Sequence, residues 1–268
     1  MSGLKLDRVV RRFGRGRSTL VAVDGVDLEV RPGEILGLVG ESGSGKTTIA
    51  RLATGLDHPD EGTVTLDGKP LRDATGRIGR ANRRAVQMVF QDPLASFNPG
   101  RRIGNAIALP LKLNKRHSRA QLLVQIDELM AAVGLAPELA MRYPAELSGG
   151  QLQRAAIARA LASRPSILVC DEPVASLDVS VRAQVLNLLV RLKATRGQGV
   201  LFISHDLGVV QRLADAAVVL HRGRVVERGT GDALWQQPQH AYTQALVAAV
   251  PTGLVPWREQ RRLPGSNS

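Results

Sequence analysis

The sequence predicts an α/β fold, in which a β-sheet is covered by helices. Two observations predict it. Short apolar segments of β type lie near both ends of the 268-residue chain, and several are followed by glycine loops or helical patterns. Apolar residues also recur at the spacing of one helix face, namely Val181, Val185, Leu188, Leu189 and Leu192. A chain of this length suits one large domain or one domain with an insertion.

The strands expected in chain order are residues 19–23, 26–30, 35–39, 63–66, 86–90, 167–170, 200–203 and 217–220. Residues 93–161 hold few β-type runs and many helix formers, which predicts a helical insertion. After Gly229 a mostly helical tail is expected to reach Pro251, and the final stretch WREQRRLPGSNS is expected to be loose. We therefore divide the chain into a core of residues 1–92 and 163–232, a helical subdomain of residues 93–162 and a C-terminal tail of residues 233–268.

The composition favours a cytosolic protein. Hydrophobic residues make up 44% of the chain and aromatic residues 3%, so we expect a core of Ala, Leu, Val and Ile. No apolar run approaches the roughly 18 residues of a membrane-spanning helix, and the start MSGLKLDRVVRRFG lacks the apolar stretch of a signal peptide. The single cysteine, Cys170, excludes internal disulfides and a cysteine-built cluster or zinc site within the chain.

The net charge of +12 indicates a negatively charged partner or a solvated, arginine-rich surface. Basic residues cluster at residues 5–17, 69–84, 101–119 and 258–262. Nucleic acid and the anionic inner face of a membrane both fit this charge. No aromatic stacking platform or nucleic-acid motif accompanies the basic clusters.

The stretch EILGLVGESGSGKTTIARL reads as a strand, a glycine loop and a helix in that order. Its spacing is that of a P-loop, whose glycines let backbone N–H groups surround phosphate oxygens. Lys46 supplies a charge for the β- and γ-phosphates, and the Thr47 hydroxyl reaches Mg²⁺. The residues expected to bind the nucleotide here are Gly40, Glu41, Ser42, Gly43, Ser44, Gly45, Lys46, Thr47 and Thr48.

A second segment, ILVCDEP, places two carboxylates at the end of a buried strand. Neighbouring strand residues point to opposite faces of the sheet, so only one of the two carboxylates can readily be oriented by the ligand shell of a magnesium ion. We assign Asp171 to Mg²⁺ and Glu172 to the attacking water as general base.

A third segment, ELSGGQLQR, again places two glycines at what reads as a helix start, which suits a phosphate. With the two segments above, it resembles the ATP-binding subunits of ATP-binding cassette (ABC) transporters, and the resemblance covers essentially the whole chain. The family signature LSGGQ ends at Gln151, 20 positions before Asp171. The resemblance implies a P-loop NTPase (RecA-like) core with an antiparallel β subdomain and an inserted α-helical subdomain. It also implies ATP hydrolysis in a dimer, in which Ser148, Gly149, Gly150 and Gln151 face the γ-phosphate held by the other subunit.

The resemblance carries further residues over by their motifs. Gln91 in VFQDP matches the glutamine that senses the metal and the water, and Asp178 in SLD matches the loop that crosses the dimer interface. His205 in FISHD matches the histidine that contacts the γ-phosphate. Phe13 is the best candidate for the aromatic residue that stacks on adenine. The catalytic residues are thus expected to be Glu172, His205, Gln91 and Lys46, and the metal ligands Thr47, Gln91 and Asp171.

Two longer stretches resemble sequences of the oligopeptide/dipeptide/nickel importer branch of the family: QDPLASFNPGRR and QQPQHAYTQALVAAVP. The YP-x-x-LSGGQ form of the signature region is also that of importer subunits. Some members of the branch continue with cysteines that ligate an iron–sulfur cluster; here none follows Pro251, so we expect no cluster. The chain resembles the shorter of the two ATPase subunits that such importers pair.

The resemblance implies a peripheral protein on the cytoplasmic face of the cell membrane. Its expected partners are a second ATPase subunit, in a homodimer or a heterodimer, two membrane permease subunits and, indirectly, an extracytoplasmic solute-binding protein. Nucleic acid is not expected. The alternatives are a soluble ABC ATPase acting on nucleic acid and the ATPase of an exporter; neither a coiled-coil insertion nor a zinc-type cysteine set supports the first.

Overall fold

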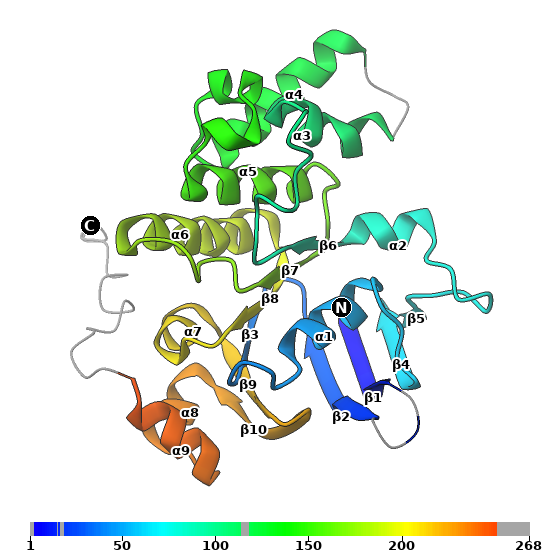
Figure 1. Ribbon diagram of the computed structural model, residues 1–268, viewed down its shortest axis with the longest axis vertical. Helices are drawn as coiled ribbons and strands as arrows, with labels where there is room; N and C mark the ends of the chain where they lie inside the picture. Colours follow the sequence, from blue (N-terminus) through cyan, green and yellow to red (C-terminus); the bar gives the residue numbers. More distant parts are fainter. Residues whose placement is uncertain (1–2, 15, 17–18, 114–117, 251–268) are drawn as a thin grey trace, which may run out of the picture.

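The computed structural model describes residues 3–14, 16, 19–113 and 118–250. Its elements form a six-stranded sheet, a four-stranded sheet beside it and a group of helices at one end (Figure 1). Within this described part, no helix is long and apolar enough to cross a membrane.

The larger sheet has the order β10–β9–β3–β8–β7–β6. Its strands are β3 (Ile35–Val39), β6 (Val86–Val89), β7 (Ile167–Asp171), β8 (Gly199–Ser204), β9 (Ala216–His221) and β10 (Arg224–Thr230). All neighbours are parallel except β9 and β10. Every residue of β3, β7 and β8 is buried, which explains why these strands read as continuous apolar runs. The pairings Val39–Ser204 and Asp171–Ile203 bring the carboxyl ends of these strands to one edge.

The smaller sheet is antiparallel, with the order β2–β1–β4–β5. Its strands are β1 (Leu4–Phe13), β2 (Leu20–Val30), β4 (Glu61–Leu66) and β5 (Lys69–Pro70). The prediction of separate strands at 19–23 and 26–30 was wrong, because residues 20–30 form the single strand β2. Its pairing with β1 shifts register between Leu6 and Arg12 of β1. The sequence reading also missed β1 and β10. In β1 the buried Leu4, Leu6 and Val9 are separated by polar residues of the basic cluster at residues 5–17, which hides the apolar pattern of a strand.

Helix α1 (Lys46–Thr54) packs between the two sheets, where Ile49, Ala50, Leu52 and Ala53 join one apolar cluster with residues of β1 to β3. The short helix α2 (Arg80–Ala85) leads into β6. On the other face of the larger sheet lie α6 (Val179–Arg196) and α7 (Leu207–Leu213). The helix face expected in α6 is confirmed at Val185, Leu188, Leu189 and Leu192, which are buried, whereas Val181 is half-buried.

The helical group contains α3 (Ile103–Lys112), α4 (Arg119–Ala132), two short 3-10 turns (Pro137–Met141 and Pro144–Glu146) and α5 (Gly149–Leu161). None of the described residues between 93 and 162 lies in a strand. Helix α5 packs against α3, α4, α6 and β6, so it joins the helical group to the larger sheet (Figure 1). One apolar cluster runs through this contact, from Ile107 and Met130 to Val200 and Phe202.

After β10 the chain forms α8 (Gly231–Gln236) and α9 (Ala241–Ala248), which lie next to β9 and β10 (Figure 1). The loose end expected after Pro251 and the basic cluster at residues 258–262 lie outside the described residues.

Candidate active site

The P-loop connects the end of β3 to the start of α1. Gly43 and Gly45 have φ angles of 80° and 107°, which side chains rarely allow. A Cβ atom at Gly40 would lie 2.2 Å from the Leu220 carbonyl oxygen, and one at Gly45 would lie 2.3 Å from that of Ala22. The loop therefore requires glycine for its conformation and for its close packing against neighbouring backbone. Ser44 is buried, and its hydroxyl has no hydrogen-bond partner among the described residues, as expected of a loop shaped for an anion.

The phosphate-binding lysine candidate lies inside this loop. Lys46 is 5% exposed, and its Nζ donates to the carbonyl oxygens of Gly40 and Glu41 at 2.8 Å each. Nζ also lies 3.9 Å from Oε1 of Glu172. Burial lowers the pKa of Lys46, and the nearby carboxylates of Glu172 and Asp171 oppose that change. A buried ammonium ion next to backbone N–H groups is a strong anion site.

Asp171 is the last residue of β7, and it is 3% exposed. The Thr47 hydroxyl, in the first turn of α1, donates to Oδ1 of Asp171 at 3.4 Å. Burial raises the pKa of the Asp171 carboxyl; the hydrogen bond from Thr47 opposes the rise and the neighbouring Glu172 adds to it. A hydroxyl and a carboxylate brought together from two elements fit Mg²⁺, which prefers hard oxygen ligands and completes its shell with phosphate and water.

Glu172 follows the strand and has a φ of 45°, which is costly for a residue with a side chain. Its Oε2 accepts a hydrogen bond from Nε2 of Gln91 at 3.3 Å and lies 2.9 Å from Nδ1 of His205. Its backbone N–H donates to the Ile203 carbonyl at 3.0 Å. Three of the predicted catalytic residues thus meet at one carboxylate oxygen.

Most of these residues line one cavity of about 1010 Å³, large enough for a nucleotide, whereas Gly40, Ser44 and Asp171 are not among its lining residues. The predicted residues that line it are Phe13, Glu41, Ser42, Gly43, Gly45, Lys46, Thr47, Thr48, Gln91, Glu172 and His205. Phe13, at the end of β1, is 38% exposed, and the Arg11 guanidinium lies 4.8 Å from the centre of its ring. Sequence reasoning missed several lining residues, among them Leu20, Ala22, Arg222 and, from α9, Leu246. Leu20, Ala22 and Arg222 belong to no motif, so no local signal identified them. Leu246 lies in the tail stretch QQPQHAYTQALVAAVP, whose resemblance did not point to the nucleotide site.

The signature residues lie elsewhere in the chain. Ser148 caps α5: its hydroxyl accepts from the Gln151 N–H at 3.3 Å, and Oε1 of Gln151 accepts from the Ser148 N–H at 2.9 Å. A Cβ atom at Gly150 would lie 2.1 Å from Cγ1 of Val181, so this glycine permits the close packing of α5 on α6. Asp178 caps α6, with its carboxylate accepting from the Val181 N–H at 2.9 Å. Among the described residues that line the P-loop cavity, neither the signature nor Asp178 appears.

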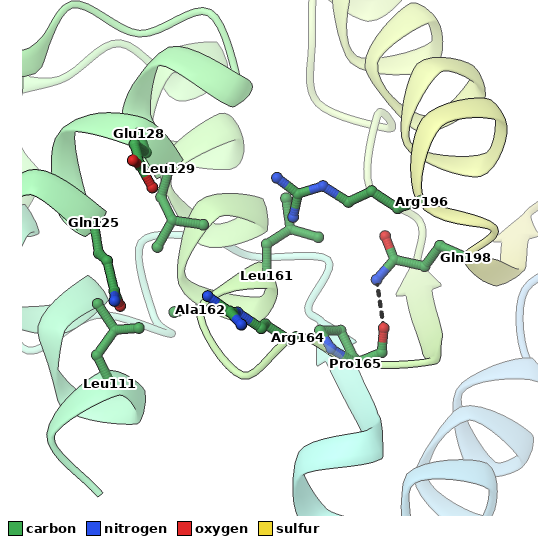
Figure 2. Close-up of a pocket in the computed structure, with 10 residues that line it drawn as sticks. All are labelled: Leu111, Gln125, Glu128, Leu129, Leu161, Ala162, Arg164, Pro165, Arg196 and Gln198. Atoms are coloured by element: carbon green, nitrogen blue, oxygen red, sulfur yellow. Dashed lines mark hydrogen bonds between the residues drawn. The ribbon is translucent and has the colours of Figure 1, made fainter. Parts of the chain in front are cut away.

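A second cavity, of about 380 Å³, lies between the helical group and the core (Figure 2). Its residues are Leu111, Gln125, Glu128, Leu129, Leu161, Ala162, Arg164, Pro165, Arg196 and Gln198. Figure 2 shows the Gln198 side chain donating to the Pro165 carbonyl, at 2.9 Å. The residues that we predict to bind nucleotide do not line this cavity.

The comparisons with known proteins decide the family. Residues 23–175, more than half of the chain, match the ABC transporter family. The chain belongs to that family. As an ABC transporter ATPase, it binds ATP. The predicted α/β P-loop NTPase fold is also confirmed.

Similar proteins of known name cover most of the chain. It is 48% identical over 240 residues to the oligopeptide transport ATP-binding protein OppF of Escherichia coli, which covers 89% of this chain and 72% of that protein. It is 44% identical over 243 residues to the di/tripeptide transport ATP-binding protein DppF of Pseudomonas aeruginosa, covering 91% of this chain and 75% of that protein.

Solved structures of ATP-binding cassettes also match this chain. A dimeric, post-hydrolysis state of the ATP-binding cassette MJ0796 with ADP and Pi matches with a TM-score of 0.76 and 30% identity, covering 85% of this chain and 98% of that one. The structure of cbiO1 from Clostridium perfringens, part of the ABC transporter complex cbiONQ, matches with a TM-score of 0.77 and 25% identity, covering 87% of this chain and 90% of that one.

Proposed function

We propose that this chain is the ATP-hydrolysing subunit of an importer of peptides or related small solutes. The observation that carries the proposal is the 44–48% identity to peptide-transport ATP-binding proteins over about nine-tenths of the chain. That similarity covers more of the chain than the ABC transporter match, which ends at residue 175. A further relative, from Brucella abortus and 48% identical over 255 residues, is named a putative peptide import ATP-binding protein, which favours import over the two alternatives, action on nucleic acid and export.

In this proposal the P-loop cavity holds ATP. Phe13 stacks on the adenine, and the loop of residues 40–48 surrounds the phosphates with backbone N–H groups. Lys46 neutralises charge on the β- and γ-phosphates. Thr47 and Asp171 would hold Mg²⁺, which, when bound, neutralises phosphate charge. The 3.4 Å distance between Thr47 Oγ1 and Asp171 Oδ1, which leaves room for one ion to contact both, supports this pair as the protein's ligands, with Gln91 assigned to the same metal from its motif.

Hydrolysis requires that a water attack the γ-phosphorus and lose a proton. Glu172 accepts that proton as general base, because its Oε2 faces the cavity beside two polar groups that can orient it. Gln91 and His205 position the carboxylate and contact the water or the γ-phosphate. The bond between the γ-phosphorus and the β–γ bridging oxygen breaks. Negative charge shifts to that oxygen as it leaves with ADP, where Lys46 and the loop N–H groups stabilise it.

The signature serves a second ATPase subunit in this account. Ser148, Gly149, Gly150 and Gln151 begin α5 at a separate place from the P-loop cavity, and Ser148 and Gly149 are exposed. Exposed N–H groups at a helix start can bind the γ-phosphate held by the partner's P-loop. Asp178, also exposed, lies at the same contact between subunits. The partner is a second copy or a homologous ATPase subunit.

We assign the permease contact to the segment of residues 91–102. This segment joins the core (1–92 and 163–232) to the helical subdomain (93–162). Leu94 is 52% exposed there, and Phe90, directly before the segment, is 37% exposed, which leaves apolar surface for a partner. The segment is anchored: the Arg159 guanidinium of α5 donates to the carbonyl and, at 3.0 Å, to the hydroxyl of Ser96. Through two permease subunits the protein is held at the cytoplasmic face of the cell membrane, and an extracytoplasmic solute-binding protein delivers the solute.

The test is complementation of peptide uptake. A strain lacking this subunit should regain uptake of a labelled tripeptide with the wild-type gene and not with Glu172→Gln, and the wild-type chain should co-purify with two permeases. Hydrolysis stimulated by nucleic acid, in a protein that brings down no membrane permease, would overturn the proposal.

A further inference from the structure

The C-terminal tail contains the stretch QHAYTQAL, to which neither the fold nor the proposed mechanism gives a role. It forms the loop before α9 and most of that helix, beside the turn between β9 and β10. Leu246 of α9 lines the P-loop cavity, although it lies about 200 positions from the loop. The helix is therefore close enough to the nucleotide site to act on it.

Several contacts fix the start of α9. Nδ1 of His240 accepts from the Tyr242 N–H at 3.1 Å and so caps the helix. The Glu227 carboxylate of β10 accepts from the N–H groups of Gln239 at 2.8 Å and His240 at 3.0 Å. Thr243 is fully buried. These contacts tie the helix start to the larger sheet and leave little freedom for the side chain of Tyr242, which directly precedes Thr243.

The side chain of Tyr242 reaches the P-loop. Its ring centre lies 4.0 Å from that of His221, at the end of β9. Its hydroxyl oxygen accepts from the backbone N–H of Glu41 at 2.9 Å. Tyr242 and Leu246 are four residues apart, so the same face of α9 supplies both contacts with the site.

The Glu41 N–H belongs to the same peptide group as the Gly40 carbonyl. That carbonyl accepts from Nζ of Lys46 at 2.8 Å. One peptide group of the P-loop is thus held at its N–H by Tyr242 and at its oxygen by Lys46. Because a lysine ammonium has three donors and two go to Gly40 and Glu41, the orientation of this peptide group decides where the third points.

We propose that Tyr242 is a positioning residue for nucleotide binding: it fixes the Gly40–Glu41 peptide group and, through it, the Lys46 ammonium. The inference rests on the proposed role of Lys46 as a phosphate ligand. It makes the tail part of the nucleotide site, with His240 and Glu227 presenting the tyrosine.

Tyr242→Phe tests the proposal in the full chain, because it removes the hydroxyl and keeps the ring. We expect the Kd for ATP, measured by calorimetry, to rise roughly three- to tenfold, the effect of one ordinary hydrogen bond. The KM for ATP should rise with it while kcat at saturating ATP stays close to wild type. The Glu41 amide should shift in the ¹H–¹⁵N spectrum and exchange faster. Tm should fall by no more than about 2–4 °C, the cost of one hydrogen bond.

The matched control is Gln244→Ala, on an exposed position of the same helix, where the side chain donates to the Pro238 carbonyl. It should bind ATP as wild type does. Wild-type affinity in Tyr242→Phe, with binding lost in Lys46→Ala, would overturn the proposal and leave the phosphate site intact. Wild-type affinity in Lys46→Ala as well would overturn the proposed site itself. Equal weakening in Tyr242→Phe and Gln244→Ala, with Tm lowered by more than one hydrogen bond explains, would reduce the tail to a structural role.

Discussion

Nδ1 of His205 lies 2.9 Å from Oε2 of Glu172, so a residue after β8 contacts the carboxylate that follows β7. Nε2 of Gln91, after β6, lies 3.3 Å from the same oxygen. Three parallel neighbours in the sheet, β6, β7 and β8, therefore supply one residue each to a single point at their carboxyl ends. This is where open α/β sheets bind their ligands.

Replacing the proposed general base should separate binding from turnover. Glu172→Gln keeps the shape and the contact with Gln91 but cannot accept a proton. We expect ATP affinity to stay near wild type and hydrolysis at this chain's P-loop to fall about 10²- to 10⁴-fold. Phosphate release from the assembled ATPase measures it. Brisk hydrolysis by the variant would remove Glu172 from the role of base.

Replacing the proposed metal ligand should stabilise the protein when no nucleotide is bound. Burial raises the pKa of Asp171, so its ionised form weakens the fold at neutral pH. Asp171→Asn can still accept from Thr47 and carries no charge. We expect Tm of the nucleotide-free protein to rise, by roughly 2–4 °C for each kcal/mol recovered, and Mg²⁺-dependent ATP binding to fall.

The stability difference between wild type and Asp171→Asn should depend on pH, and the raised pKa of Asp171 gives the direction of that dependence. A carboxyl whose pKa is raised by folding binds more protons in the folded state. Its contribution to stability is therefore present below the unfolded pKa of about 4 and is lost as pH rises through the folded value. The stability difference between Asp171→Asn and wild type should grow over that interval, as followed by denaturant unfolding. A difference that is constant with pH would contradict the buried charge.

The two signature glycines should respond differently to alanine. A Cβ atom at Gly150 would lie 2.1 Å from Cγ1 of Val181, while one at Gly149 comes no closer than 3.9 Å to Cδ2 of Leu177. Gly150→Ala should cost about 1–3 kcal/mol of unfolding free energy, and Gly149→Ala should change it by less than about 0.5 kcal/mol. Urea unfolding compares the two. Equal losses would show that α5 does not pack on α6 as described.

The chemistry-bearing parts of the fold could be predicted because their signals are local. Strands β3, β7 and β8 are buried on both faces, so each reads as an apolar run, and each runs directly into a motif. Strand β1 was missed because its buried residues alternate with charged ones, and β10 because it is an edge strand with no fully buried residue. The contact of Tyr242 with Glu41 could not be predicted, since it joins residues 201 positions apart.

The roles of Gln91, His205 and Asp178 came from the resemblance, since each is an ordinary polar residue by itself. The structure brings Gln91 and His205 to Glu172 but leaves Asp178 at a helix start, exposed. A residue that acts on the partner subunit's nucleotide gives no sign of it within one chain.

In the proposed mechanism the signature serves a partner's nucleotide and the P-loop serves this chain's own. The most direct measurement is ATP affinity of the isolated, folded chain carrying Gly149→Asp, compared with Lys46→Ala. We expect wild-type affinity for Gly149→Asp, with turnover lost in the assembled ATPase, and at least about tenfold weaker binding for Lys46→Ala. Loss of ATP binding in a folded Gly149→Asp monomer would contradict it.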